Sequence, residues 1–347
     1  DVSTSFSSPI VDGTTSASIY YIPSNTLSGS TTYYWRVRGQ HTSGPWNGYP
    51  TSWSSTHSFT SSFPYDGPVW YISPNGSEFA EGTEGNPLNN FFNAHQKTNP
   101  GDTIYVMPGT YTGEYNQGIS NSQDEHHLTI IGTGSVDETI FELTDTFISF
   151  SNLSNGNIQN ISFTTNGSML NPYAIFVGNN GQSTLALDNC KFFNIQGKSV
   201  FINHNAIGII NNCVFSGNTS TETPNRGGSS FYVGENTQLN ISNSLFYDNN
   251  DYFDGYGNKG TIHFSQNNFS LNIINCTFYD NGGEQSEAID DGHHECSNCV
   301  GTIDISNSIF YSDIIDAPNA TLSLTSSLIY GQEGTGNFYA DPLFLDV

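Results

Sequence analysis

Basic side chains are scarce in this chain of 347 residues. Seven Lys and Arg residues stand against 32 Asp and Glu residues, which gives a formal net charge of −25. Nucleic-acid binding needs clustered Lys and Arg to contact phosphates, so this composition argues against a nucleic-acid partner. The sequence also lacks any run of about 18 consecutive apolar residues, and it therefore predicts no membrane span in this segment.

Cysteine is also rare. The sequence has five cysteines, Cys190, Cys213, Cys276, Cys296 and Cys299. An odd number cannot all pair within one chain, which argues against a disulfide-stapled scaffold. Cys296 and Cys299 form a C-x-x-C motif after His293 and His294, but a second ligand pair at zinc-finger spacing is missing. A local disulfide, free thiols and a metal site all remain open for this motif.

Aromatic residues are abundant at 14%, which favours a folded chain over a disordered one. In the first 65 or so residues, Thr31–Gly39 alternates Tyr33, Trp35 and Val37 with polar or basic residues. This alternation predicts a strand with one buried face, and the stretch 57–59 predicts a closing strand.

The segment 27–60 resembles the last half of a fibronectin type III module. The resemblance rests on Leu27, on the run Thr32-Tyr-Tyr-Trp-Arg-Val-Arg38, on Trp53-Ser and on Ser58-Phe-Thr60. It implies a partial module over residues 1–62, and the first two strands of such a sandwich are missing. The alternative is a small β-cap. The Pro- and Gly-rich stretch 63–68 predicts a linker.

A repeated motif dominates the rest of the chain: an apolar strand, then Asn, two residues and Phe. Its copies begin at Asn160, Asn189, Asn212, Asn243, Asn275 and Asn307, and a degenerate copy begins at Ser326. A constant motif at irregular spacing predicts the coils of a solenoid with loops of varying length. Asn accepts a left-handed turn and can hydrogen-bond along a stack. The small residues after it, Cys190, Cys213, Ser244, Cys276 and Ser308, are expected to form one interior column.

The stretch from Trp70 to Tyr111 resembles the capped start of right-handed parallel β-helix proteins, the pectate-lyase-like superfamily. Asn86-Pro87 and the apolar Leu88, Phe91 and Phe92 predict a capping helix near 87–98. The resemblance covers residues 69–347 and implies an all-β fold, a right-handed parallel β-helix preceded by the partial fibronectin-like module.

Two long loops after the repeat motif, 247–260 and 279–299, are rich in acids and aromatics. Because successive coils of a solenoid lie about 4.8 Å apart, these loops are expected to form one ridge. The candidate calcium ligands are Asp248, Asp251, Asp254, Asp280, Glu284, Glu287, Asp290 and Asp291. The candidate glycan-binding residues are Tyr247, Tyr252, Tyr256 and Tyr279.

Several interpretations of this ridge stay open: a calcium site, a glycan site, the acid and base of a glycosidase, or a solvated acidic face without a ligand. The superfamily resemblance implies that a lyase also needs a basic residue to neutralise or deprotonate its substrate. Arg226 and Lys259 are the basic residues on long loops, and with Asp248 and Asp254 they form the candidate catalytic set.

The sequence favours an extracellular or cell-surface segment of a large bacterial protein, an adhesin or structural stalk that contacts glycans or other surfaces. The alternative is a calcium-dependent polysaccharide lyase or glycoside hydrolase acting at the acidic ridge. A second alternative is a self-assembling extracellular filament with homotypic contacts. Calcium is the one cofactor expected, and no organic cofactor is expected.

Overall fold

The computed structural model describes residues 4–7, 12–14, 31–60, 66–122, 125–167, 169–170, 173–178, 181–220, 228–251, 260–265, 267–281, 287–290, 300–311 and 314–329. The chain divides into two compact units, Asp1–Asp66 and Gly67–Val347. Within the described ranges, none of the helices is long and apolar enough to cross a membrane.

The first unit contains a small antiparallel sheet of β1 (Thr32–Trp35) and β2 (His57–Thr60), with a 3-10 turn η1 (Gly44–Trp46) between them. Tyr33 is buried as expected. Trp35 and Val37 are 44% and 59% exposed, so the expectation of a longer buried face is wrong for them. The strand ends at Trp35, and the alternation therefore does not extend to Val37. Two strands do not test the fibronectin-like resemblance, which remains a prediction.

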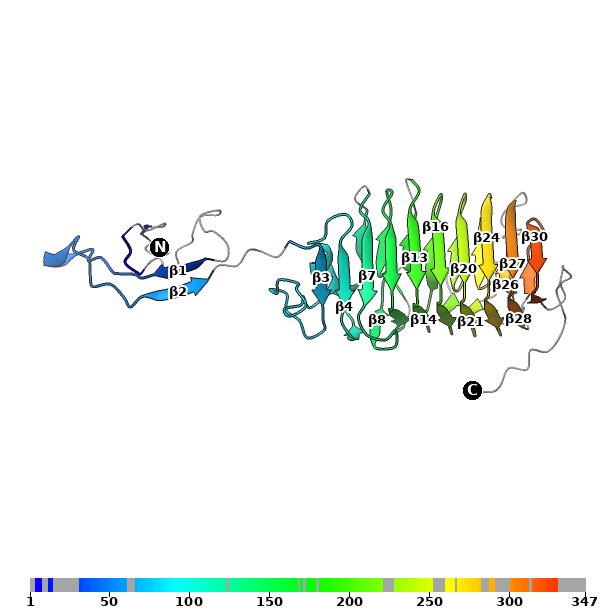
Figure 1. Ribbon diagram of the computed structural model, residues 1–347, viewed down its shortest axis with the longest axis horizontal. Coiled ribbons are helices and arrows are strands. Elements are labelled where there is room, and N and C mark those ends of the chain that lie inside the picture. The colour runs from blue at the N-terminus through cyan, green and yellow to red at the C-terminus, as the bar shows by residue number, and fades with distance from the viewer. Residues whose placement is uncertain are drawn as a thin grey trace. The chain divides into compact units, whose positions relative to one another are not determined.

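The second unit is a parallel β-helix built from three sheets (Figure 1). The ten-stranded sheet contains β3 (Val69–Ile72), β4 (Thr103–Val106), β7 (Leu128–Gly132), β10 (Gly156–Gln159), β13 (Thr184–Asp188), β16 (Ile207–Asn211), β20 (Gln238–Ser242), β24 (Phe269–Ile274), β27 (Gly301–Ser306) and β30 (Thr321–Thr325). The nine-stranded sheet contains β5 (Gly109–Tyr111), β8 (Thr139–Leu143), β11 (Ser162–Thr165), β14 (Lys191–Phe193), β17 (Val214–Ser216), β21 (Leu245–Tyr247), β25 (Thr277–Tyr279), β28 (Ile309–Tyr311) and β31 (Leu328–Ile329).

The eight-stranded sheet contains β6 (Ile119–Asn121), β9 (Ile148–Phe150), β12 (Tyr173–Val177), β15 (Lys198–Ile202), β19 (Phe231–Val233), β23 (Ile262–Phe264), β26 (Glu287–Asp290) and β29 (Ile314–Asp316). A short pair, β18 (Thr219–Ser220) and β22 (Asn250–Asp251), lies between the nine- and eight-stranded sheets in chain order. Each complete coil contributes one strand to each large sheet. This arrangement confirms the predicted all-β parallel β-helix.

Stacked phenylalanines form the core beneath the nine-stranded sheet. The rings of Phe192, Phe215, Phe246, Phe278 and Phe310 lie 4.3 to 5.0 Å apart from one coil to the next, with interplanar angles of at most 9°. All five side chains are fully buried. Parallel strands place equal positions of successive coils above one another, so one residue type repeated at one position fills the core as a stack.

The repeat asparagines hold the sharp turn between the ten- and nine-stranded sheets. Every motif Asn, from Asn160 to Asn307, has a left-handed φ of 50° to 57°. Their amides also bond along the stack: Nδ2 of Asn189 donates to Oδ1 of Asn160 at 2.6 Å, and Nδ2 of Asn275 donates to Oδ1 of Asn243 at 3.2 Å. Both predicted roles of this asparagine are therefore confirmed.

The small residues after the motif Asn form the predicted interior column. Each backbone N–H of the column donates to the next side chain: Cys190 to Sγ of Cys213, Cys213 to Oγ of Ser244, and Cys276 to Oγ of Ser308. Burial raises the pKa of the Cys276 thiol to about 11. These cysteines are structural, because a buried thiol that resists ionisation is a poor nucleophile.

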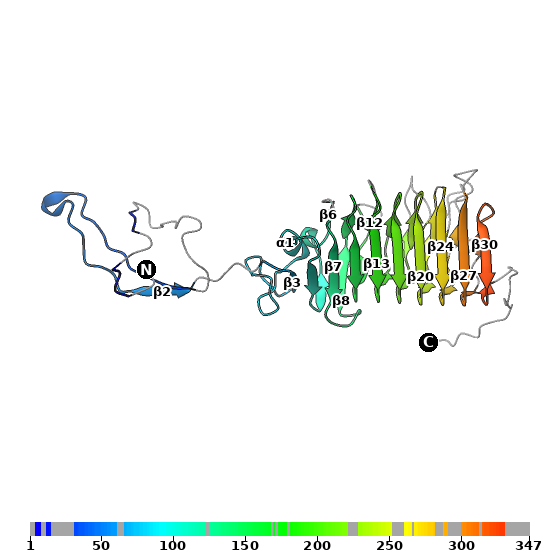
Figure 2. The same cartoon turned by 45° about the horizontal axis from the view of Figure 1, so that its top comes forward.

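The helix α1 (Phe91–His95) lies at the β3 end of the solenoid (Figure 2). The helix is shorter than expected and begins at Phe91 rather than at Pro87. Leu88 instead bridges to Ile72 of β3, and its N–H donates to the carbonyl of Tyr71. Asn90 caps the helix through Oδ1, which accepts from the N–H of Asn93 at 2.8 Å. A second 3-10 turn, η2 (Glu114–Asn116), packs against α1.

Candidate functional site

Asp248 and Asp280 occupy turns that follow β21 and β25. Both have left-handed backbones, with φ of 55° and 52°. The asparagines after them are buried and form a second ladder, in which Nδ2 of Asn249 donates to Oδ1 of Asn281 at 2.8 Å. These aspartates therefore hold positions that the turn geometry already uses.

Glu287 and Asp290 lie elsewhere, on strand β26 of the eight-stranded sheet. Both side chains are buried. Only the backbone of Asp251 is described, in β22. Among the described residues, no group of three or more His, Cys, Asp or Glu side chains is placed to hold a metal ion.

The remaining candidates lie outside the described residues: Arg226, Tyr252, Asp254, Tyr256, Lys259, Glu284 and Asp291, together with His293, His294, Cys296 and Cys299. The two described tyrosine candidates, Tyr247 and Tyr279, pair in register at the ends of β21 and β25. The Tyr279 ring stacks on Tyr311 of the next coil at 5.7 Å.

A hydrogen-bonded pair that the sequence analysis did not identify lies on the eight-stranded sheet. His263 of β23 and Asp290 of β26 are register partners. Nδ1 of His263 lies 2.9 Å from Oδ2 of Asp290, and the side chains are 0% and 1% exposed. Ile262 and Phe264 point into the core, so alternation along the strand turns His263 to the outer face.

Two more side chains extend this site toward the preceding coils. The ring of Tyr232, the register partner of His263 on β19, lies 5.3 Å from the imidazole. Nζ of Lys198 lies 5.3 Å from the centre of the Tyr232 ring and 3.5 Å from Oγ of Ser220. Lys198 is only 1% exposed, which is unusual for a lysine and indicates a defined role for its charge.

The arrangement combines a base, an orienting carboxylate, a hydroxyl and a cation. A carboxylate that accepts from Nδ1 fixes the imidazole tautomer and stabilises its protonated form, which suits Nε2 for proton transfer. A buried ammonium nearby can stabilise negative charge on a ligand. The histidine escaped sequence analysis because nothing local distinguishes the segment 261–264 from the other strands of the repeat.

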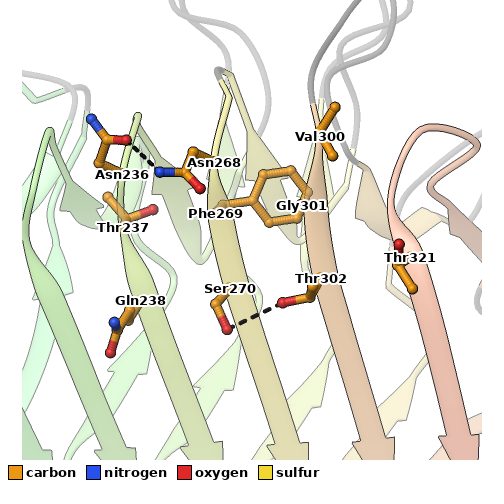
Figure 3. Close-up of a pocket in the computed structure, with 10 residues that line it drawn as sticks. All are labelled: Asn236, Thr237, Gln238, Asn268, Phe269, Ser270, Val300, Gly301, Thr302 and Thr321. Carbon is orange, nitrogen blue, oxygen red and sulfur yellow. Dashed lines mark hydrogen bonds between the residues drawn. The ribbon is translucent and has the colours of Figure 1, made fainter.

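A hollow of about 320 Å³ opens at the edge of the ten-stranded sheet (Figure 3). Its lining residues are Asn236, Thr237, Gln238, Asn268, Phe269, Ser270, Val300, Gly301, Thr302 and Thr321. Within it, Nδ2 of Asn268 donates to Oδ1 of Asn236 at 2.7 Å, and the hydroxyls of Thr302 and Ser270 lie 3.3 Å apart. None of these side chains is titratable, so the hollow offers hydrogen bonds to a ligand but no proton transfer.

Comparison with known proteins finds limited likeness. No protein-family model matches the chain. Over 54 residues the chain is 41% identical to pectate lyase L of Dickeya chrysanthemi and 39% identical to pectate lyase L of Dickeya dadantii (strain 3937). Each match covers 16% of this chain and 13% of the relative, so the chain spans about an eighth of the length of these curated relatives.

Two solved structures share the general form of the chain. A rhamnogalacturonan lyase aligns with a TM-score of 0.36 at 13% identity, over 77% of this chain and 75% of its own. The pectate lyase Pel9A aligns with a TM-score of 0.40 at 13% identity, over 75% of this chain and 79% of its own.

Proposed function

We propose that this chain is a polysaccharide lyase that acts on an acidic glycan at the outer face of the eight-stranded sheet. The observation that carries the proposal is the His263–Asp290 pair, which is outward-facing, fully buried and joined at 2.9 Å. Oriented histidine–carboxylate pairs of this kind perform general acid–base catalysis. The buried Lys198 supplies the positive charge that a uronate substrate requires.

The reaction is a β-elimination. Nε2 of His263 takes the proton from the sugar carbon next to the carboxylate, C5, while Lys198 stabilises the charge that develops on that carboxylate. The electrons of the broken C–H bond form the C4–C5 double bond, and the bond from C4 to the glycosidic oxygen breaks. The imidazolium, held by Asp290, then returns the proton to the departing oxygen. Because the pair is buried, this face must open before a glycan reaches it.

The short match to two pectate lyases agrees with this class of reaction. The net charge of −25 opposes long-range attraction of a polyanion, so binding depends on short-range contacts. A calcium ion would reduce this repulsion, but the described carboxylates alone do not form a site for it. Calcium thus remains a proposal for the acidic loops, and no step of the elimination depends on it.

The adhesin or stalk reading has no support in the described structure or in the comparisons. A secreted or cell-surface location, with glycans as partners, remains part of the proposal because it suits a chain rich in hydroxyl and amide side chains. Homotypic assembly into a filament remains a prediction.

The test is a depolymerisation assay with a panel of acidic and neutral polysaccharides, following unsaturated products, for the intact chain and for His263→Gln. We expect the variant to lose about 10²- to 10⁴-fold in rate, the range for a general base. The control is Asp304→Asn, an exposed carboxylate on the outer face of β27, which should keep the full rate. An unchanged rate in His263→Gln, or no cleavage of any acidic polysaccharide, would refute the proposal.

A further inference from the structure

A row of aromatic side chains crosses the outer face of the eight-stranded sheet and ends at His263. Phe176 of β12, Phe201 of β15 and Tyr232 of β19 are successive register partners, and Tyr232 pairs with His263. The ring centres lie 5.3 Å apart from Phe176 to Phe201 and 4.9 Å apart from Phe201 to Tyr232. Tyr173 lies beside the row, 5.5 Å from both phenylalanines.

The geometry of this row differs from that of the core stack. Core rings such as Phe215 and Phe246 are parallel within 3°, whereas Phe201 stands at 79° to both Phe176 and Tyr232. Tyr173, Phe176 and Phe201 are only partly buried. Contiguous apolar side chains that remain partly exposed, rather than scattered ones, mark sites of interaction.

We propose that this aromatic row, Tyr173, Phe176, Phe201 and Tyr232, is a platform for a β-(1→4)-linked acidic glycan that runs along the solenoid axis toward His263. The proposal deepens the lyase assignment and rests on it for the direction of the chain. The ligand chemistry follows from the rings: a pyranose whose substituents are equatorial presents its axial C–H bonds as a flat apolar face, and that face packs on an aromatic ring.

The spacing of the coils favours this linkage. Ring orientation changes by 79° at each of two successive coils, so one kind of ring face recurs after two coils, about 9.6 Å at the strand spacing of a sheet. An extended β-(1→4)-linked chain turns alternate sugars over and repeats as a disaccharide of similar length. An α-(1→4)-linked galacturonan has axial glycosidic oxygens, which keep its sugar faces away from the rings.

The experiment measures binding separately from cleavage, with β-(1→4)-glucuronan oligosaccharides as the probe and oligogalacturonate as the comparison. Calorimetric titration is carried out in the His263→Gln background, which blocks turnover. Phe176→Ala and Phe201→Ala are each expected to weaken glucuronan binding about 3- to 10-fold. The matched control is Tyr105→Ala, because Tyr105 stacks on Tyr71 at 5.1 Å on the other large sheet, far in sequence from the row.

Each outcome decides. Weakened binding in the two row variants but not in Tyr105→Ala, and tighter binding of glucuronan than of galacturonate, supports the platform. Unchanged binding in the row variants, equal loss in Tyr105→Ala, or a preference for galacturonate refutes it. If the intact chain cleaves a glycan while the row variants keep their affinity and KM, the platform fails and the lyase assignment stands. If the row variants lose binding and no glycan is cleaved, the lyase assignment fails and the platform stands.

Discussion

The outer faces of the ten-stranded and eight-stranded sheets share one backbone plan and differ in chemistry. On the ten-stranded sheet, outward positions of successive coils hold small polar residues such as Asn240, Asn272 and Asp304, which remain partly or fully exposed. The corresponding column of the eight-stranded sheet runs from Phe201 through Tyr232 and His263 to Asp290. The last three of these side chains are buried.

The difference separates what specifies the solenoid from what a function can use. Inward positions are apolar under both sheets, and they alone are needed to stack coils. A soluble solenoid is satisfied by a polar outer face, so a face of aromatic and ionisable side chains has another cause. Burying a lysine and a histidine–aspartate pair costs stability unless the contacts compensate, and such costs are typical of functional sites.

The largest effect should come from the core that both faces share. Phe246 is fully buried between Phe215 and Phe278, at 4.8 and 4.4 Å. Phe246→Ala should lower the free energy of unfolding by about 3–5 kcal/mol, through lost burial and the cavity left behind. Denaturant titration measures the change, and Phe79→Ala at an exposed site is the control. A cost near that of the control would show that the stack does not hold the coils together.

A smaller effect should separate the two outer faces. Asp290→Ala removes the carboxylate that His263 contacts at 2.9 Å inside the protein, and it should cost about 1–3 kcal/mol. Asp304→Ala removes an exposed carboxylate from the other face and should change stability by no more than about 0.5 kcal/mol. Thermal melting of the two variants under one condition gives the comparison. Equal shifts would mean that the buried pair contributes nothing that a surface carboxylate does not.

Much of the fold could be predicted because the solenoid repeats its signal. One asparagine could not have identified a turn, but successive copies from Asn160 onward pointed to a left-handed position, and the structure has φ near 50° at each. The helix boundary was predicted less well. Pro87 and Leu88 fit a first helical turn locally, yet Leu88 is held by a bridge to β3, and such a tertiary contact leaves no local pattern.

The candidate site was much harder to predict than the fold. Acidic residues attract notice when they are close in sequence, whereas a parallel solenoid brings together residues one coil apart. His263 and Asp290 are 27 positions apart and meet only through register. Asp290 was a candidate metal ligand, and the structure instead places it on a histidine. Assigning that contact required the register of β23 and β26, which irregular coil lengths conceal in the sequence.

The smallest effect concerns other buried histidines, at the capped end of the solenoid. His95 of α1 and His126 stack at 5.9 Å. His95 contacts Oδ1 of Asn121 at 3.0 Å, and His126 contacts Oγ1 of Thr98 at 3.3 Å. Neither contact is a carboxylate, unlike the Asp290 contact of His263. Burial lowers the pKa of His95 below its ordinary value of 6.5, opposed by the Asn121 hydrogen bond. Burial likewise lowers the pKa of His126, opposed by the charge of Asp102.

The direction of the pH effect follows from these pKa shifts. Below pH 6.5 the unfolded chain binds protons at both histidines more readily than the folded chain, so stability is full above that pH and is lost as the pH falls below it. A double variant, His95→Gln with His126→Gln, should flatten the fall in melting temperature between pH 6.5 and pH 5. His204→Gln, an exposed histidine 3.8 Å from Glu235, should leave the fall unchanged. If the double variant kept the full pH dependence, acid sensitivity would instead originate elsewhere, with the His263–Asp290 face as the next place to test.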